Sequence, residues 1–170
     1  MRSFQLSRTL RSLALAAGAS VLVLSLAGNA EAKRSSTSDT NCTRSNGYWG
    51  THSSFGPSAY DPTWANVGEG TPFFLSGLSY YQVMVITAHQ HPYYMLGIQY
   101  IAAALNAYQG AEMPPDVLAA FMDATSLFQA YAPTYDFVTD PDGVTVEFED
   151  LENILKLYNR GRIGPGSCKR

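Results

Sequence analysis

The stretch YYMLGIQYIAAALNAY, residues 93–108, carries a long helical pattern of apolar side chains. Apolar residues recur in it at steps of three and four, which is the period of a helix that buries one face. The members of this stripe are Tyr94, Ile98, Ile101, Leu105 and Tyr108. Pro92 precedes the stretch and Gly110 follows it, so both ends carry residues that interrupt helices. The pattern predicts a helix over 93–108.

Further helices are predicted on both sides of this one. An S-x-x-Q capping box at 79–82 indicates a helix from 79 to about 88. Pro115 suits the first turn of another helix. A last helix is expected over 149–159, and residues 144–148 alternate weakly, which favours a short extended piece.

Residues 42–72 are rich in glycine, serine, proline and aromatic residues, and show no sustained period. We expect an ordered but irregular segment whose aromatic side chains lie against the helices. These aromatic residues are Tyr48, Trp49, Phe55, Tyr60 and Trp64. Gln99 and Asn106 border the apolar stripe of the helix at 93–108, and we expect their amides to hydrogen-bond this segment and fix how it docks. The predicted fold is mainly α, a small domain of about four helices with the aromatic-rich N-terminal segment packed on it.

The N-terminal residues 1–32 have the features of a secretory signal peptide. Three arginines precede an apolar run at 13–27, which is shorter than the roughly 20 residues that a membrane-spanning helix needs. Ala30-Glu31-Ala32 supplies an A-x-A cleavage pattern. We expect a flexible leader at 33–41, a single helical domain at 42–170, and a secreted protein, periplasmic or extracellular, with no membrane span after cleavage.

Composition and charge exclude several classes. The 170 residues are 46% hydrophobic, 12% aromatic and 15% charged, which excludes a disordered tail and a disulfide-dense miniprotein. The formal charge is −3 for the whole chain and −5 after residue 32. Between Ser45 and Leu155 there is no lysine or arginine but there are twelve carboxylates. Such an acidic body repels phosphate backbones, so nucleic-acid binding is not expected.

The two cysteines, Cys42 and Cys168, lie near the two ends of the predicted domain. In an exported chain a disulfide between them is the preferred interpretation, and two free thiols or pairing with another chain are the alternatives. The bond would gather Arg44, Lys169 and Arg170 at one pole.

The three histidines are the candidate metal ligands. His89 and His91 form an H-x-H pair of a kind that ligates zinc or copper, and His52 could complete a three-ligand site. The sequence contains no G-x-S-x-G, no H-E-x-x-H and no phosphate-cradling glycine loop. A metal-assisted hydrolase using these histidines is therefore the enzymatic alternative.

Two non-catalytic interpretations remain. The preferred one is a structural or interaction domain without catalysis and without a cofactor, whose partner is a surface protein or an extracellular matrix component. The other is a carbohydrate-binding module using exposed aromatic residues, Trp49 and Trp64 with tyrosines such as Tyr48, because aromatic rings stack on sugars.

Three stretches resemble a domain found in secreted and surface proteins of bacteria. CTRSNGYWGTH at 42–52 resembles its C-T-x-[ST]-x-G-Y-W-K-x-H opening, QYIAAALN at 99–106 its Q-L-I-A-A-x-L-N helix, and YNRGRIGPGSC at 158–168 its Y-N-x-G-x-I-G-P-G-H-C ending. The resemblance implies a surface location and paired cysteines, and no assigned activity. The chain departs from the pattern at Gly50, where the family has lysine, and at Ser167, where it has histidine.

Overall fold

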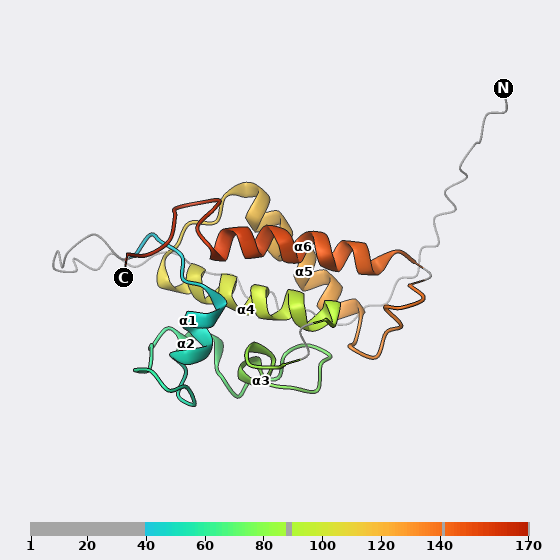
Figure 1. The fold of residues 1–170 in the computed structure, drawn as a ribbon, viewed down its shortest axis with the longest axis horizontal. Coiled ribbons are helices and arrows are strands. Elements are labelled where there is room, and N and C mark those ends of the chain that lie inside the picture. Colours follow the sequence, from blue (N-terminus) through green and yellow to red (C-terminus); the bar gives the residue numbers. More distant parts are fainter. Residues whose placement is uncertain (1–39, 88–89, 141, 170) are drawn as a thin grey trace, which may run out of the picture. The chain divides into compact units, whose positions relative to one another are not determined.

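The computed structural model describes residues 40–87, 90–140 and 142–169. The predicted signal peptide, most of the predicted leader and His89 lie outside the described residues. Within them the protein is helical, as predicted, with six helices (Figure 1). Their bounds are α1 Asn46–Thr51, α2 Trp64–Val67, α3 Tyr80–Met84, α4 Pro92–Gln109, α5 Pro115–Ala130 and α6 Val144–Asn159.

Helix α4 is the centre of the fold. All five other helices contact it, with α6 along one side and α1, α2 and α3 along the other (Figure 1). Residues 96–106 are buried without interruption, which is why this stretch is apolar around most of its circumference rather than on one stripe only. Pro92 occupies its first turn and Gly110 ends it in the left-handed conformation.

Helix α6 begins earlier than predicted, and the extended piece expected at 144–148 is wrong. Val144 and Phe148 are the first two buried residues of this helix, and Leu155 and Tyr158 continue the same face. The start is fixed by Asp140, whose carboxylate accepts hydrogen bonds from the backbone N–H groups of Val144 at 2.7 Å and Thr145 at 3.0 Å. The weak alternation of 144–148 is therefore the first turn of a helix.

The segment before α4 is more regular than expected, because it contains two short helices, α1 and α2. Helix α3 begins where the capping box predicted, with Ser79 and Gln82 bonded reciprocally. It ends at Met84, so the expected extension to about residue 88 is wrong.

Aromatic rings from four parts of the chain meet in the core. Phe73 precedes α3, and its ring centre lies 6.2 Å from that of Tyr93 on α4 and 4.9 Å from that of Phe128 on α5. Phe148 on α6 packs edge-on against Phe128 at 5.9 Å. All four side chains are fully buried. The contacts are edge-to-face, the arrangement that aromatic pairs favour, and they fasten the N-terminal segment to the helical layer.

Candidate functional site

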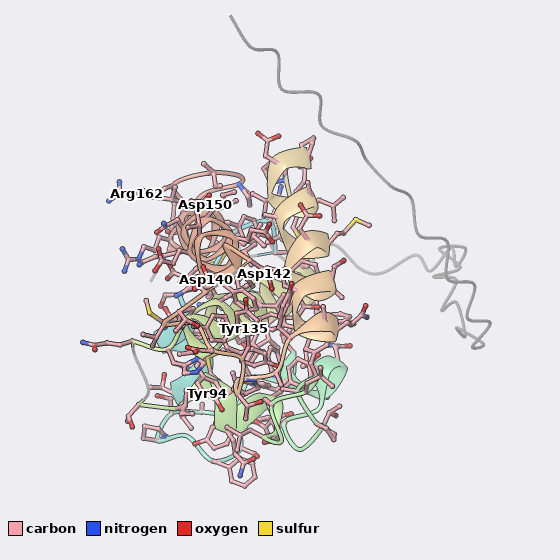
Figure 2. All side chains as sticks on the ribbon, turned by 90° about the vertical axis from the view of Figure 1, so that its right-hand side faces the viewer. Tyr94, Tyr135, Asp140, Asp142, Asp150 and Arg162 are labelled. Atoms are coloured by element: carbon pink, nitrogen blue, oxygen red, sulfur yellow. A yellow bond between two sulfur atoms is a disulfide. The ribbon has the colours of Figure 1, made fainter. Side chains whose placement is uncertain are left out.

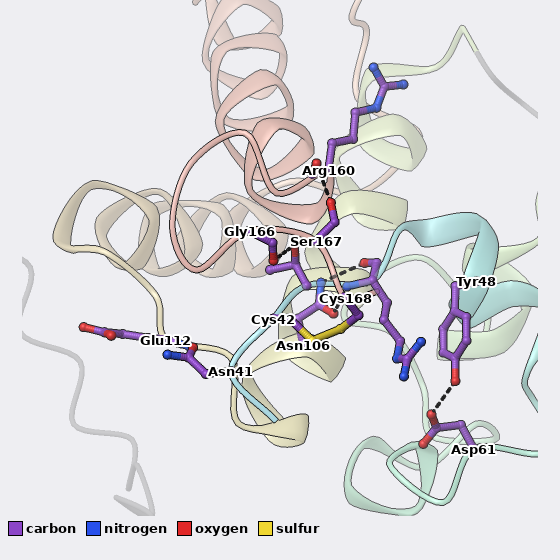
Figure 3. The surroundings of a disulfide bond; sticks show 12 residues. Asn41, Cys42, Tyr48, Asp61, Asn106, Glu112, Arg160, Gly166, Ser167 and Cys168 are labelled. Carbon is purple, nitrogen blue, oxygen red and sulfur yellow. Dashed lines mark hydrogen bonds between the residues drawn. A yellow bond between two sulfur atoms is a disulfide. The ribbon is translucent and has the colours of Figure 1, made fainter. Parts of the chain in front are cut away.

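The two ends of the domain are joined beside the C-terminus of α6. Cys42 and Cys168 form the predicted disulfide (Figure 3). The two chain segments next to the disulfide pair through their backbones. Thr43 N–H donates to the Gly166 carbonyl at 2.8 Å, and Cys168 N–H donates to the Thr43 carbonyl at 3.0 Å. The C-terminal segment is thereby held against the N-terminal one.

A tight turn returns the C-terminal segment onto α6. Gly161 has φ +63°, and a Cβ at this position would lie 2.2 Å from the Ser167 nitrogen, so only glycine fits. The Ser167 hydroxyl donates to the Arg160 carbonyl at 2.9 Å (Figure 3). The turn therefore brings Cys168 and Lys169 next to Arg160.

Asn106 lies at the centre of a buried polar network behind the disulfide. Its Oδ1 accepts from the Arg44 N–H at 2.8 Å and from Trp49 Nε1 at 3.1 Å. Its Nδ2 donates to the Arg44 carbonyl at 2.9 Å and to Asn159 Oδ1 at 3.0 Å. Asn159 Nδ2 in turn donates to the carbonyl of Gln99 and to its Oε1. Asn106 thus binds the N-terminal segment directly, whereas Gln99 bonds to α6.

Tyr48 carries a second, more exposed cluster on α1. The Arg44 guanidinium carbon lies 4.2 Å from the centre of the Tyr48 ring, and the His52 ring stacks on Tyr48 at 3.8 Å. The Tyr48 hydroxyl donates to Asp61 at 2.9 Å. The pKa of Tyr48 is raised, chiefly by partial burial and also by this hydrogen bond and the negative charge of Asp61. Burial opposes ionisation of Asp61, but hydrogen bonds from Thr63 and Tyr48 outweigh it and lower the pKa of Asp61.

A basic cavity of about 330 Å³ opens beside the disulfide. Three of its lining residues are cations, Arg44, Arg160 and Lys169, and none of its described lining residues is acidic. Arg160 and Lys169 are exposed, and Arg44 is partly buried with no hydrogen-bond partner at Nε among the described residues. In the part of the chain that the structure covers, the only ion pair joins Lys156 to Glu152 at 3.2 Å. Among the described residues, none of the three cations of this cavity, hereafter the basic groove, therefore forms a salt bridge. The charge of Arg44 nevertheless helps to lower the pKa of Asp61, so Arg160 and Lys169 are less compensated than Arg44.

The two candidate metal ligands that the structure describes, His52 and His91, lie in separate surroundings. His52 bonds the Tyr48 carbonyl through Nδ1 at 2.8 Å, and His91, just before α4, bonds the Pro133 carbonyl through Nε2 at 3.0 Å. His89 is outside the described residues. Within those residues no group of three or more histidine, cysteine or acidic side chains is arranged to hold a metal ion.

The expectation that Trp49 and Trp64 are exposed is wrong. Both side chains are fully buried. The Trp64 Nε1 donates to the Trp49 carbonyl at 3.0 Å, and Trp49 donates to Asn106, so both indole N–H groups are used inside the protein. Neither ring is available for stacking on a sugar.

A second cavity, of about 890 Å³, lies at the other end of α6 and was not predicted. Its lining includes Asp136, Glu149 and the rings of Tyr135 and Phe137. Figure 2 looks onto this end, where the Tyr135 hydroxyl lies 3.5 Å from an Asp140 oxygen and 3.4 Å from an Asp142 oxygen. Carboxylates are clustered in residues 136–149, but the sequence did not show that two of them, Asp136 and Glu149, line a cavity.

None of the helices in the described residues is both long enough and apolar enough to cross a membrane. In comparisons with known proteins, no family model, no curated protein and no solved structure matches the chain. The function is therefore inferred from the chain's own contacts, charges and cavities.

Proposed function

We propose that this protein is a non-catalytic interaction domain that binds an acidic surface protein or matrix component through the basic groove. The observation that carries the proposal is the set of three cations, Arg44, Arg160 and Lys169, in one cavity that has no acidic residue in its described lining and where the described residues form no salt bridge. The rest of the described domain is rich in carboxylates, so the groove is the part of the surface that attracts anions.

The construction of the groove supports binding rather than chemistry. Asn106, behind the groove, and Asn159, in its lining, both use their side-chain amides in internal hydrogen bonds. The disulfide and the bond from the Ser167 hydroxyl to the Arg160 carbonyl hold the backbone that carries the cations in position before a partner arrives. Such preorganisation reduces the ordering entropy lost on binding. The disulfide is also compatible with an extracellular location, where such bonds persist.

Binding of a fluorescent oligoglutamate peptide to the full chain, followed by anisotropy, tests the proposal. An exposed ion pair contributes roughly 0.2–1 kcal/mol, so changing Arg44, Arg160 and Lys169 together to Gln should weaken binding about tenfold. Arg162 is an exposed arginine that does not line the groove, and Arg162→Gln should leave the affinity within about twofold. Equal losses in the triple variant and in Arg162→Gln would contradict the proposal.

Salt provides an independent check on the same interaction. Exposed charges are screened over roughly 10 Å at 0.1 M salt, so the wild-type affinity should fall steadily as salt is added. The triple variant should show a flatter salt dependence. An affinity for oligoglutamate that is independent of salt would assign the binding to another surface.

A further inference from the structure

We propose that the basic groove is one end of a longer binding channel along α6, and that the channel holds an extended polypeptide segment that is acidic at one end and basic at the other. The inference rests on the proposed function and names the chemical class of the partner. A row of cavities follows the seam between α4 and α6.

Neighbouring cavities share lining residues along this seam. The cavity of about 890 Å³ and one of about 250 Å³ share Gln90, Pro92 and Glu149. The latter shares Met95, Glu152 and Lys156 with a cavity of about 340 Å³, which meets the basic groove at Arg160. The four cavities therefore follow one another in a row along this seam, and we treat this row as the channel.

Helices α4 and α6 shape the channel. Glu149, Glu152, Lys156 and Arg160 follow at steps of three and four on α6 and its C-cap, so they share one face. Met95 and Ile98 of α4 line the middle of the channel together with Val85, which is 44% exposed although apolar.

Charge changes sign along the channel. At one end Asp136 and Glu149 are acidic, and hydrogen bonds from Thr139 and Val138 lower the pKa of Asp136, so its carboxylate stays charged. In the middle Lys156 and Glu152 neutralise each other. At the other end Arg160, Arg44 and Lys169 are basic. A uniform polyanion is repelled at the acidic end, whereas a segment with opposite charges at its ends is attracted at both.

The dimensions favour an extended segment. Arg160, the C-cap of α6, follows Glu149 by eleven positions, a distance of roughly 16 Å at 1.5 Å per residue. The two middle cavities, about 250 and 340 Å³, lie one after the other along this length, a row that a chain lying lengthwise can follow. An extended chain rises about 3.3 Å per residue, so about five uncharged residues separate the two charged ends.

The experiment compares three labelled probes on the full, disulfide-bonded chain. The first is a peptide with a glutamate pair and a lysine pair separated by about five apolar residues. The second has the same composition with the charges alternating, and the third is a uniform polyanion, either oligoglutamate or oligogalacturonate. We expect the first to bind about tenfold more tightly than the second.

Two charge reversals locate the ends. Glu149→Lys and Arg160→Glu should each weaken the first peptide by roughly fivefold to tenfold. Glu147, which lies on α6 outside the channel cavities, supplies the control, and Glu147→Lys should change the affinity by less than about twofold.

The outcomes separate the two proposals. One outcome is that the uniform polyanion binds as tightly as the first peptide and that Glu149→Lys strengthens binding of the polyanion. The partner is then a polyanion, so the proposed function stands and the channel inference is overturned. If the first peptide binds but neither Glu149→Lys nor Arg160→Glu weakens it, the channel is also overturned. If no probe binds, both proposals fail.

Discussion

At the scale of single residues, Asn106 holds the domain together more than any other polar side chain described above. It is fully buried and bonds to Arg44, Trp49 and Asn159, which belong to the N-terminal segment and to α6. The sequence predicted its position and its contact with the N-terminal segment, because Asn106 borders an apolar stripe. It did not predict Asn159, since a link between α4 and α6 depends on tertiary packing.

Asn106→Ala should reduce the free energy of unfolding by about 3 kcal/mol or more, because it strands several buried donors and acceptors, each costing roughly 1–3 kcal/mol. Urea unfolding of the oxidised chain measures the change. Asn66 provides the control, since it is exposed and bonds only to the nearby Thr63 carbonyl. Asn66→Ala should shift stability by less than about 0.5 kcal/mol, and a comparable loss in both variants would contradict the assigned role.

Two tyrosines, the fully buried Tyr158 and the partly buried Tyr80, predict how stability depends on alkaline pH. Burial raises the pKa of Tyr80 and of Tyr158 to about 12, from 10.0. Because the folded pKa exceeds the unfolded value, their stabilisation is complete below about pH 10 and is lost as the pH rises from 10 through 12. Circular dichroism and phenolate absorbance should show unfolding and tyrosine ionisation together in that range. Tyr158→Phe should make the loss of stability between pH 10 and 12 shallower. If every tyrosine ionises near pH 10 while the protein stays folded, the raised pKa values of Tyr80 and Tyr158 are wrong.

At the scale of elements, close packing between α3 and α4 depends on Gly97. A Cβ there would lie 3.0 Å from Val83 Cγ1 and 3.3 Å from the Phe73 ring. Helix propensity alone favours alanine over glycine by about 1 kcal/mol, but overpacking costs roughly 1–3 kcal/mol. Gly97→Ala should therefore be neutral to destabilising by up to about 2 kcal/mol in thermal or urea unfolding.

Gly47 in α1 supplies the matched comparison, because its Cβ would meet only Ser45 Oγ at 3.8 Å. Gly47→Ala should be stabilising by up to about 1 kcal/mol. If Gly97→Ala stabilises the protein as much as Gly47→Ala does, the close approach of α3 and α4 is wrong.

The start of α6 depends on one of two neighbouring aspartates. Asp140 caps the helix, whereas Asp142 is exposed. Asp140→Ala should destabilise by about 1 kcal/mol, and Asp142→Ala by less than about 0.5 kcal/mol, as measured by urea unfolding. A larger loss of stability in Asp142→Ala than in Asp140→Ala would show that Asp140 is not the capping residue.

The helices that the sequence predicted well are those with strong local signals. Residues 93–108 have proline before them and glycine after them, and the α3 start has a capping box. The errors fall where tertiary contacts decide. Residues 144–148 look extended in the sequence, because the Asp140 cap that starts α6 is seen only in the structure. Helix α1 is stabilised by Trp49, and its burial against Asn106 leaves no periodic pattern in the sequence.

At the scale of the whole molecule, the disulfide closes the domain and builds the basic groove. It spans 126 residues of sequence, so replacing both cysteines by alanine should reduce the free energy of unfolding by roughly 2–5 kcal/mol. The variant should also lose affinity for oligoglutamate, because Lys169 is no longer held beside Arg44. A double variant with unchanged stability and unchanged affinity would contradict this dependence.

The sequence predicted the basic pole but not its shape. Joining Cys42 to Cys168 places Arg44 and Lys169 together, and this follows from the chain ends alone. Arg160 lines the same groove as Arg44 and Lys169 because a glycine turn returns the C-terminal segment onto α6. Arg162, two residues later, does not line the groove. That distinction depends on backbone conformation, which the sequence pattern did not resolve.

Nuclear magnetic resonance of the isotope-labelled, oxidised chain during titration with oligoglutamate tests the central claim most directly. The claim is that an acidic partner binds at the basic groove. Saturable shifts concentrated at Arg44, Arg160 and Lys169, and absent at Arg162, are the predicted result. Shifts that do not saturate, or that centre on Arg162 or another face, would contradict it.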